Sequence, residues 1–269
     1  MINVNEEYFD ENEKPLDRLC VNGGFTRIFR RIAVVGDSLS SGEFESLQSD
    51  GSHGYHDMFE YSWGQVIARS CGSEVFNFSR GGMTAMEYCN SFADNFRMWD
   101  RAKACQAYII AMGANDCFRL KPEEMGSVEK DVDLADYHNN NTNTFAGAYA
   151  TIIQRYKEIQ PRAKFFLVTL CSEEYGEDYA PDKDEKRLLF RDIIFELAEK
   201  FDNCYVIDLF KYAPRFDANY REKFCLLGHL NPMGYVFTGD MICSYIDYII
   251  RHNPDDFKEV GFIGTDLHG

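Results

Sequence analysis

The sequence predicts a single three-layer α/β/α domain built on a five-stranded parallel sheet. Three observations favour this class: a length of 269 residues, a hydrophobic fraction of 45%, and short apolar runs that alternate with helical patterns. Strands that alternate with helices form βαβ units, whose crossovers are right-handed and whose sheet is parallel. A domain of this size buries roughly three quarters of its unfolded surface, so it needs no disulfide staples.

Five apolar runs are expected to form the strands. The first, I-A-V-V at 32–35, is β-branched at three of its four positions, which is typical of a strand buried on both faces. The other four runs lie at 74–78, 107–112, 164–170 and 204–209. Helical periodicity predicts the intervening helices at 59–70, 83–103, 145–159, 184–201 and 233–251.

The remaining segments are expected to be loops or terminal additions. Residues 40–58 follow the first strand as a long loop, and such insertions are usually functional, so we expect one wall of a substrate pocket there. Residues 119–143 are predicted to form a second surface loop near the pocket. Residues 1–31 are expected to be an N-terminal appendage to a domain at 32–252. The tail at 253–269 is apolar enough to dock on the domain or on a neighbouring subunit, which leaves a homo-oligomer open.

Composition excludes several classes of partner. The formal net charge of -16 argues against nucleic acids and anionic membranes, because like charges repel. The nine cysteines form no C-x-x-C pair, which favours reduced thiols in a cytoplasmic protein. The N-terminus is acidic and lacks an apolar signal region, and no apolar run is long enough to span a bilayer.

The end of the first strand carries the first candidate for chemistry. Gly36 permits a sharp turn, and Ser38 then lies at the carboxyl end of the strand, where open α/β sheets bind ligands. A serine there, beside the start of a helix, is a candidate nucleophile. The alternative is that Asp37 or Ser38 only caps the following segment, as these residue types often do.

Four short blocks follow predicted strands or precede the last predicted helix: G-D-S-L-S at 36–40, N-F-S-R-G-G-M-T at 77–84, G-A-N-D at 113–116 and G-H-L-N-P-M-G-Y at 228–235. Each block alone is a weak signal, since short glycine motifs recur by chance. In this order and at this spacing, the chain resembles the SGNH hydrolases, also called the GDSL esterase/lipase family, over residues 32 to about 250. The resemblance implies a flavodoxin-like sheet.

The resemblance also implies roles for four residues. Ser38 would be the nucleophile and His229 the general base, while the backbone N–H groups of Ser38 and Gly82 and the side-chain amide of Asn115 would form the oxyanion hole. Physical chemistry agrees with these roles. Fixed donors stabilise the negative charge that acyl transfer builds on a carbonyl oxygen, and a near-neutral imidazole accepts the serine proton at pH 7.

One departure from the family pattern concerns the acid that orients the histidine. The family usually has aspartate three residues before the catalytic histidine, and here that position is Leu226. Three alternatives follow: a backbone carbonyl orients His229 and leaves a Ser–His dyad, another acid substitutes, or catalysis is lost and a binding pocket remains. The nearest acids in the sequence are Asp208, Asp217 and Glu222.

The other polar residues near these blocks favour structural interpretations. His53, His56 and Asp57 resemble a metal cluster, but they lack partners at zinc-like spacing and are expected to line the pocket or face solvent. We expect Asp37 and Asp116 to brace loops. Four aromatic residues are expected to form an apolar or sugar-stacking wall, or part of the core: Phe44, Tyr55, Phe59 and Tyr61.

The sequence therefore predicts a serine ester hydrolase that works through an acyl-enzyme and needs no cofactor or metal. The expected substrate is a short acyl ester of a carbohydrate or small metabolite, since no broad apolar lid helix for long lipid chains is evident. The alternative is a non-catalytic module of the same fold that binds a sugar or another small ligand.

Overall fold

Five parallel strands form the central sheet, in the order β4-β1-β5-β6-β7. The computed structural model describes residues 8–174 and 182–267. The sheet comprises β1 (Arg31–Gly36), β4 (Glu74–Ser79), β5 (Ala107–Ala111), β6 (Lys164–Val168) and β7 (Cys204–Ile207). All five strands lie where the apolar runs predict them, and the α/β class and the flavodoxin-like strand order are confirmed.

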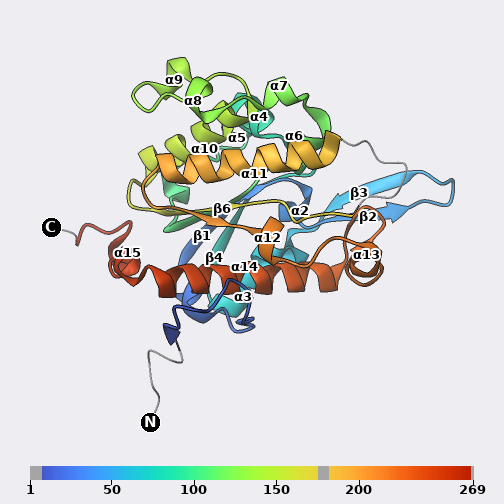
Figure 1. Cartoon of the computed structure of the whole chain (residues 1–269), viewed down its shortest axis with the longest axis horizontal. Coiled ribbons are helices and arrows are strands. Elements are labelled where there is room, and N and C mark those ends of the chain that lie inside the picture. The colour runs from blue at the N-terminus through green and yellow to red at the C-terminus, as the bar shows by residue number, and fades with distance from the viewer. Residues whose placement is uncertain (1–7, 175–181, 268–269) are drawn as a thin grey trace, which may run out of the picture.

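Helices cover both faces of the sheet (Figure 1). One face packs against α10 (Phe145–Ile159) and α11 (Asp182–Lys200), and the other packs against α3 (Trp63–Cys71) and α14 (Pro232–His252). Side chains of β5 alternate between the two cores: Tyr108 points toward α10, and Ile109 points toward α14. This alternation explains why every position of the strand is apolar.

Shorter helices and strands complete the chain. Their bounds are η1 (Gly24–Ile28), α2 (Ser38–Ser41), β2 (Glu43–Leu47), β3 (His53–Asp57), η2 (Phe59–Tyr61), α4 (Ala85–Glu87), η3 (Tyr88–Phe92), α5 (Ala93–Asn95), η4 (Arg101–Lys103), α6 (Ala114–Arg119), α7 (Pro122–Met125), α8 (Val128–Asp131), α9 (Tyr137–Asn140), α12 (Leu209–Tyr212), α13 (Ala218–Phe224), β8 (Cys225–Leu226), β9 (His229–Leu230), α15 (Pro254–Phe257) and η5 (Val260–Phe262).

The expected loop at 40–58 is a structured β-hairpin, so the prediction of an irregular loop is wrong. Strands β2 and β3 pair antiparallel from Glu43 opposite Asp57 to Leu47 opposite His53. The hairpin projects beyond the end of the sheet (Figure 1). A turn around Gly51 closes it: the Gln48 N–H donates to the Ser52 carbonyl, and the Gly51 N–H donates to the Gln48 carbonyl. The Asp-Gly pair in this turn is a sequence signal for a hairpin, but the charged residues of β2 make the segment look like a loop.

Two other expectations need correction. The continuous helix predicted at 83–103 is interrupted by the π-helical segment η3 and ends near Arg97, whose φ of 55° breaks the helical path. Tyr88 and Phe92 are buried within η3, where each turn is wider than that of an α-helix and the ordinary helical period does not hold. The surface loop expected at 119–143 contains α7, α8 and α9, because Met125 and Val128 are buried against α10.

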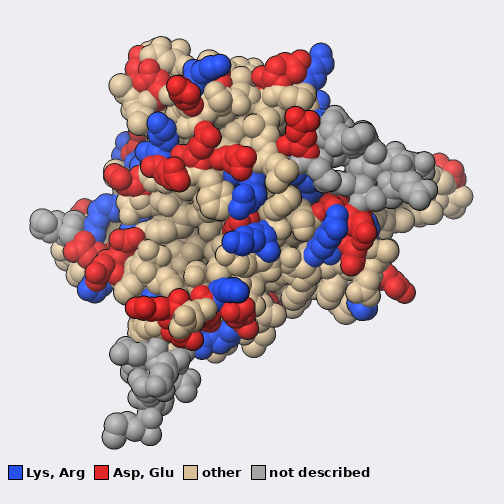
Figure 2. Space-filling model, in the orientation of Figure 1, with Lys and Arg blue, Asp and Glu red and all other residues tan. Residues whose placement is uncertain are grey.

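Both ends of the described chain pack on α14. The Phe25 N–H donates to Asp247 at 2.7 Å, and the Thr26 hydroxyl donates to the Cys243 carbonyl at 3.0 Å. Near the other end, Phe257 and Val260 are buried in the same core as α14. On the face shown in Figure 2, acidic and basic side chains are interspersed. Among residues 8–174 and 182–267, no helix is both long and apolar enough to cross a membrane.

Candidate active site

Ser38 lies where β1 ends and α2 begins, at the carboxyl edge of the sheet. Of the central strands that come after β1 in the chain, the first, β4, lies on one side of β1 and the second, β5, lies on the other. This point is therefore the topological switch at which α/β sheets bind ligands. Asp37 caps α2 by accepting the Leu39 N–H at 3.1 Å. The cap holds Ser38 at the first helical position, with its backbone N–H at the start of the turn.

Gly82 and Asn115 follow the two strands that flank β1. Gly82 has a φ of 73°, in the left-handed region that glycine tolerates best. Asn115, at the start of α6, donates from Nδ2 to the Met83 carbonyl at 3.1 Å. The side-chain amide of Asn115 is therefore anchored directly beside the Gly82 turn. Helix α2 also contacts β4, which leads into this turn.

Two buried carboxyl groups brace these turns, as expected of them. Asp116 accepts the Ala85 N–H at 3.0 Å and so holds the chain that follows Gly82. Burial raises the pKa of Asp37 to about 6 and the pKa of Asp116 to about 7. Their contacts with the backbone fit structural roles beneath the nucleophile.

His229 reaches the site from β9, which contacts both α2 and β2. Its imidazole lies between two carboxylates of β2. Nε2 is 3.0 Å from Glu43 Oε1, and Nδ1 is 3.3 Å from Glu45 Oε2. Both glutamates project from the same face of the strand because side chains two residues apart share a face. The hairpin thus forms a wall of the candidate site.

The two carboxylates set the charge of the imidazole. Burial acts to lower the pKa of His229, but the hydrogen bonds to Glu43 and Glu45 outweigh it, and the net shift is upward from the ordinary value. For Glu45, burial acts to raise the pKa, whereas hydrogen bonds from His53, Gly228 and His229 lower it overall. At neutral pH Glu45 is therefore an anion, and its charge stabilises the protonated form of the neighbouring imidazole.

The position usually held by the family's acid does not orient His229. Leu226 lies opposite His229 in the β8–β9 ladder and is 48% exposed. The acids nearest in sequence are engaged elsewhere or exposed: Asp208 pairs with Arg191 at 2.8 Å, Asp217 caps α13, and Glu222 is exposed. None of these three is the partner. A carboxylate faces Nδ1, so the dyad alternative is also wrong.

Sequence reasoning missed both glutamates that contact His229. Glu45 lies 184 positions from His229 in the sequence, and no local motif links them. The available signal was the pattern Glu43-x-Glu45 ahead of an Asp-Gly turn, which places two carboxylates on one face of a hairpin strand. Two charged side chains on a buried face need partners, and a basic group such as His229 supplies one.

The histidines of the hairpin have polar partners. His53 bonds Glu45 through Nδ1, and His56 Nε2 lies 3.0 Å from the Ser46 hydroxyl. Asp57 accepts hydrogen bonds from the Ser41 hydroxyl and from the Gly81 N–H. Within the described residues, no group of three or more histidine, cysteine or acidic side chains is arranged to hold a metal ion.

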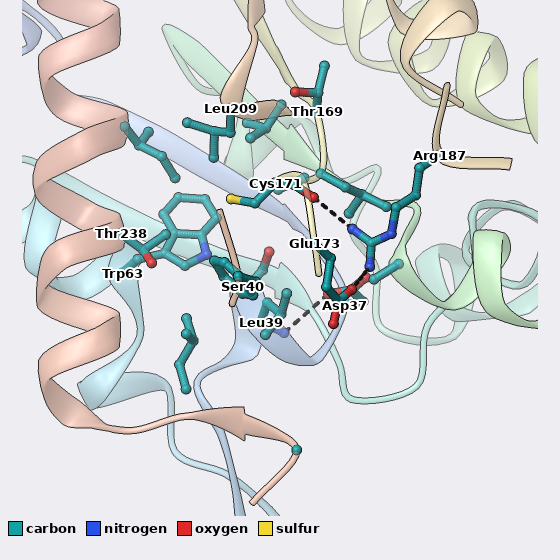
Figure 3. A pocket seen from close by; sticks show the side chains of 18 residues that line it. Asp37, Leu39, Ser40, Trp63, Thr169, Cys171, Glu173, Arg187, Leu209 and Thr238 are labelled. Atoms are coloured by element: carbon teal, nitrogen blue, oxygen red, sulfur yellow. Dashed lines mark hydrogen bonds and ion pairs between the residues drawn. The ribbon is translucent and has the colours of Figure 1, made fainter. Parts of the chain in front are cut away.

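A mostly apolar cavity of about 240 Å³ lies beside the nucleophile turn (Figure 3). Its lining includes Leu39, which follows Ser38, and Gly228, which precedes His229. Trp63 forms one wall, and Arg187 pairs with Glu173 at the opposite side. Ser38 and His229 are not among the lining residues, so the cavity adjoins the candidate nucleophile and base through their neighbours in the chain.

Comparison with known proteins identifies the family. The model of the GDSL-like Lipase/Acylhydrolase family matches residues 34–237, which include all four sequence blocks. The chain belongs to this family. It is accordingly an esterase of the GDSL type, and the resemblance of the four blocks is confirmed.

Solved structures share the fold of this GDSL esterase. A family two carbohydrate esterase from Clostridium thermocellum, in complex with cellohexaose, has a TM-score of 0.53 at 14% identity, over 84% of this chain and 65% of that chain. A Desulfitobacterium hafniense protein, described as lipolytic and of the G-D-S-L family, has a TM-score of 0.51 at 16% identity, over 80% of this chain and 99% of that chain. A search of curated proteins finds no match.

Proposed function

We propose that this GDSL esterase hydrolyses short acyl esters of a carbohydrate or small metabolite through an acyl-enzyme on Ser38. The observation that carries the proposal is the meeting of the four family blocks at one edge of the sheet. Helix α2, which begins with Ser38, contacts β9, which begins with His229, and Asn115 bonds the chain beside Gly82. A nucleophile, a base and oxyanion donors are what acyl transfer requires.

The proposed reaction has two halves. Ser38 Oγ attacks the ester carbonyl while Nε2 of His229 takes the hydroxyl proton. The N–H groups of Ser38 and Gly82 and the amide of Asn115 stabilise the oxyanion. The intermediate then expels the alcohol, which receives its proton from His229 and leaves Ser38 acylated. Water, deprotonated by His229, attacks the acyl group, releases the acid and restores the Ser38 hydroxyl.

The cavity and the hairpin support the substrate class. A volume of about 240 Å³ lies below the roughly 300–1,000 Å³ of pockets that bind drug-sized ligands, which favours a small acyl group. Tyr55 is 58% exposed, and its ring centroid lies 5.9 Å from that of His229. An exposed aromatic ring with a hydroxyl suits the apolar and polar surfaces of a sugar.

Hydrolysis of p-nitrophenyl acetate by the wild type and by Ser38→Ala tests the proposal. We expect Ser38→Ala to lose about 10⁴- to 10⁶-fold in kcat, because loss of a serine nucleophile removes the covalent path. The matched control is Ser91→Ala, at an exposed serine outside the site, which should retain wild-type rates. Equal rates for Ser38→Ala and the wild type would contradict the proposal and favour a non-catalytic binding module.

A chain-length series tests the substrate class separately. We expect kcat/KM to be highest for acetyl esters, to decline from butyryl to octanoyl esters, and to include release of acetate from acetylated oligosaccharides. Tyr55→Ala should raise KM for the oligosaccharide and leave the KM for p-nitrophenyl acetate unchanged. A preference for octanoyl esters would contradict the short-acyl proposal while leaving the esterase chemistry intact.

A further inference from the structure

We propose that Glu45 is the positioning carboxylate of this esterase and replaces, from the β2–β3 hairpin, the acid that the family usually carries three residues before its histidine. The inference rests on the proposed function, in which His229 is the base for Ser38. It assigns a role to a residue outside all four family blocks.

Three contacts hold the Glu45 carboxylate in one orientation. Oε2 accepts the Gly228 N–H at 2.7 Å and faces His229 Nδ1 at 3.3 Å, while Oε1 bonds His53. The side chain is only 6% exposed. A buried carboxylate with three donors is fixed in place, as a group must be if it is to hold an imidazole in one tautomer and orientation.

The residue next to the histidine is shaped for this contact. A Cβ at position 228 would lie 2.7 Å from Glu45 Oε2, closer than such atoms approach in proteins. Glycine thus lets the backbone N–H and the adjacent imidazole meet the same carboxylate oxygen. The hairpin and the histidine loop therefore fit together specifically through Glu45.

The roles of the two imidazole nitrogens assign the position to Glu45 rather than to Glu43. In a Ser–His–acid arrangement, the acid binds Nδ1, and Nε2 exchanges the proton with serine. Glu43 lies on Nε2, the nitrogen that Ser38 requires, so its contact must be released during the reaction. Glu45 lies on Nδ1 and can remain bound throughout the cycle.

The charges around His229 support the same assignment. Glu43 and Glu45 face the ring from β2, Tyr55 lies edge-on from β3, and the buried Asp37 interacts with it electrostatically from the nucleophile turn. Hydrogen bonds lower the pKa of Glu45, so its charge is present at neutral pH. That charge stabilises the imidazolium that forms when Ser38 gives up its proton.

The deciding experiment moves the acid back to the family position. Residues 226 and 229 are opposite each other in the β8–β9 ladder, so their side chains share a face about 4.5–5.5 Å apart at Cβ. We expect Glu45→Gln to lower kcat by up to about 10⁴-fold with little change in KM. Leu226→Asp in the Glu45→Gln protein should then recover about tenfold or more in kcat.

Two controls separate positioning from folding. Glu60→Gln, at an exposed glutamate outside the site, should match the wild type in kcat and thermal midpoint. NMR titration of the His229 imidazole in the Ser38→Ala background should show a lower pKa after Glu45→Gln, because one of the groups that raise it is gone. If Gln at position 45 prevents folding, Glu45→Asp replaces it and should lower kcat, with recovery by Leu226→Asp.

Three outcomes would overturn the proposal. A wild-type kcat in Glu45→Gln, with Ser38→Ala inactive, would remove Glu45 and leave the esterase mechanism standing. A loss of kcat without recovery by Leu226→Asp, and with an unchanged His229 pKa, would show a purely structural role. Wild-type rates in Ser38→Ala would remove the proposed function and the role of Glu45 with it.

Discussion

The turns at the carboxyl edge of the sheet and the β2–β3 hairpin both contribute to the candidate site, but they are built in different ways. Ser38 and Asn115 lie where the chain turns after β1 and β5, and the sheet itself brings these turns together. Glu43 and Glu45 lie on a two-stranded hairpin, and their carboxylates meet the His229 imidazole and the Gly228 N–H from a distant part of the sequence. Local sequence thus places the proposed nucleophile and oxyanion donors, whereas long-range packing determines which groups contact the proposed base.

After the nucleophile Ser38, the sheet-edge turns can be tested at Asn115. Asn115→Ala removes one oxyanion donor while Gly82 and Ser38 remain, and we expect kcat to fall by about 10²- to 10³-fold. KM should change little, because the donor acts mainly in the transition state. Steady-state kinetics with p-nitrophenyl acetate measure the effect, with the exposed Asn90→Ala as control. An unchanged kcat would exclude Asn115 from the oxyanion hole.

The fit between the hairpin and the histidine loop should be the next most sensitive feature. Gly228→Ala places a Cβ 2.7 Å from Glu45 Oε2 and must displace the carboxylate or the loop. Because small misplacements of a catalytic group are costly, we expect kcat to fall by about 10²-fold. The matched control is Gly261→Ala, where a Cβ would meet nothing within 4 Å. Equal kcat values for the two variants would contradict the close fit at Gly228.

Glu43 provides a test in which the hairpin changes pH dependence rather than maximal rate. The pKa of His229 is raised, so the imidazole is protonated, and unable to act as base, up to a higher pH than usual. Glu43→Gln removes one of the carboxylates that raise this pKa. The acid limb of kcat/KM should therefore move toward lower pH, with little loss of rate at high pH.

Profiles from about pH 5 to 9 for the wild type, Glu43→Gln and Glu60→Gln measure this shift. The Glu60 variant should retain the wild-type profile. A limb that stays in place, or that moves to higher pH in Glu43→Gln, would show that Glu43 does not act on Nε2. A large loss of rate at every pH would instead assign Glu43 the positioning role that we give to Glu45.

Much of the fold could be predicted from the sequence because its signals are local. A β-branched run such as 32–35 must be buried on both faces, and the helix at 145–159 has the bounds that its periodicity predicts. The prediction of one helix at 83–103 was wrong because part of this segment is π-helical. Tyr88 and Phe92 pack inward from that part, where the ordinary helical period does not apply.

The candidate site divides in the same way. Ser38, Gly82, Asn115 and His229 were predicted as site residues because each lies in one of the four short blocks that carry the resemblance to the family. Glu43 and Glu45 were not, because their function depends on a register between β2 and β3 and on a contact across 184 positions. From the sequence alone, a charged residue on a hairpin is expected to be exposed, because charged side chains are seldom buried without a partner.

The smallest effect is expected at Leu226, which occupies the position where the family usually carries its acid. A substitution there tests whether this side chain contributes to catalysis. Leu226 is half exposed and contributes no polar group to His229, so Leu226→Ala should keep kcat within about twofold and stability within about 0.5 kcal/mol. Thermal unfolding and p-nitrophenyl acetate kinetics measure both quantities. A tenfold loss of kcat would mean that the Leu226 side chain helps to hold the β8–β9 pair, and with it His229, in position. The base would then be oriented by packing from its own loop as well as by the hairpin, and Glu45 would share its role.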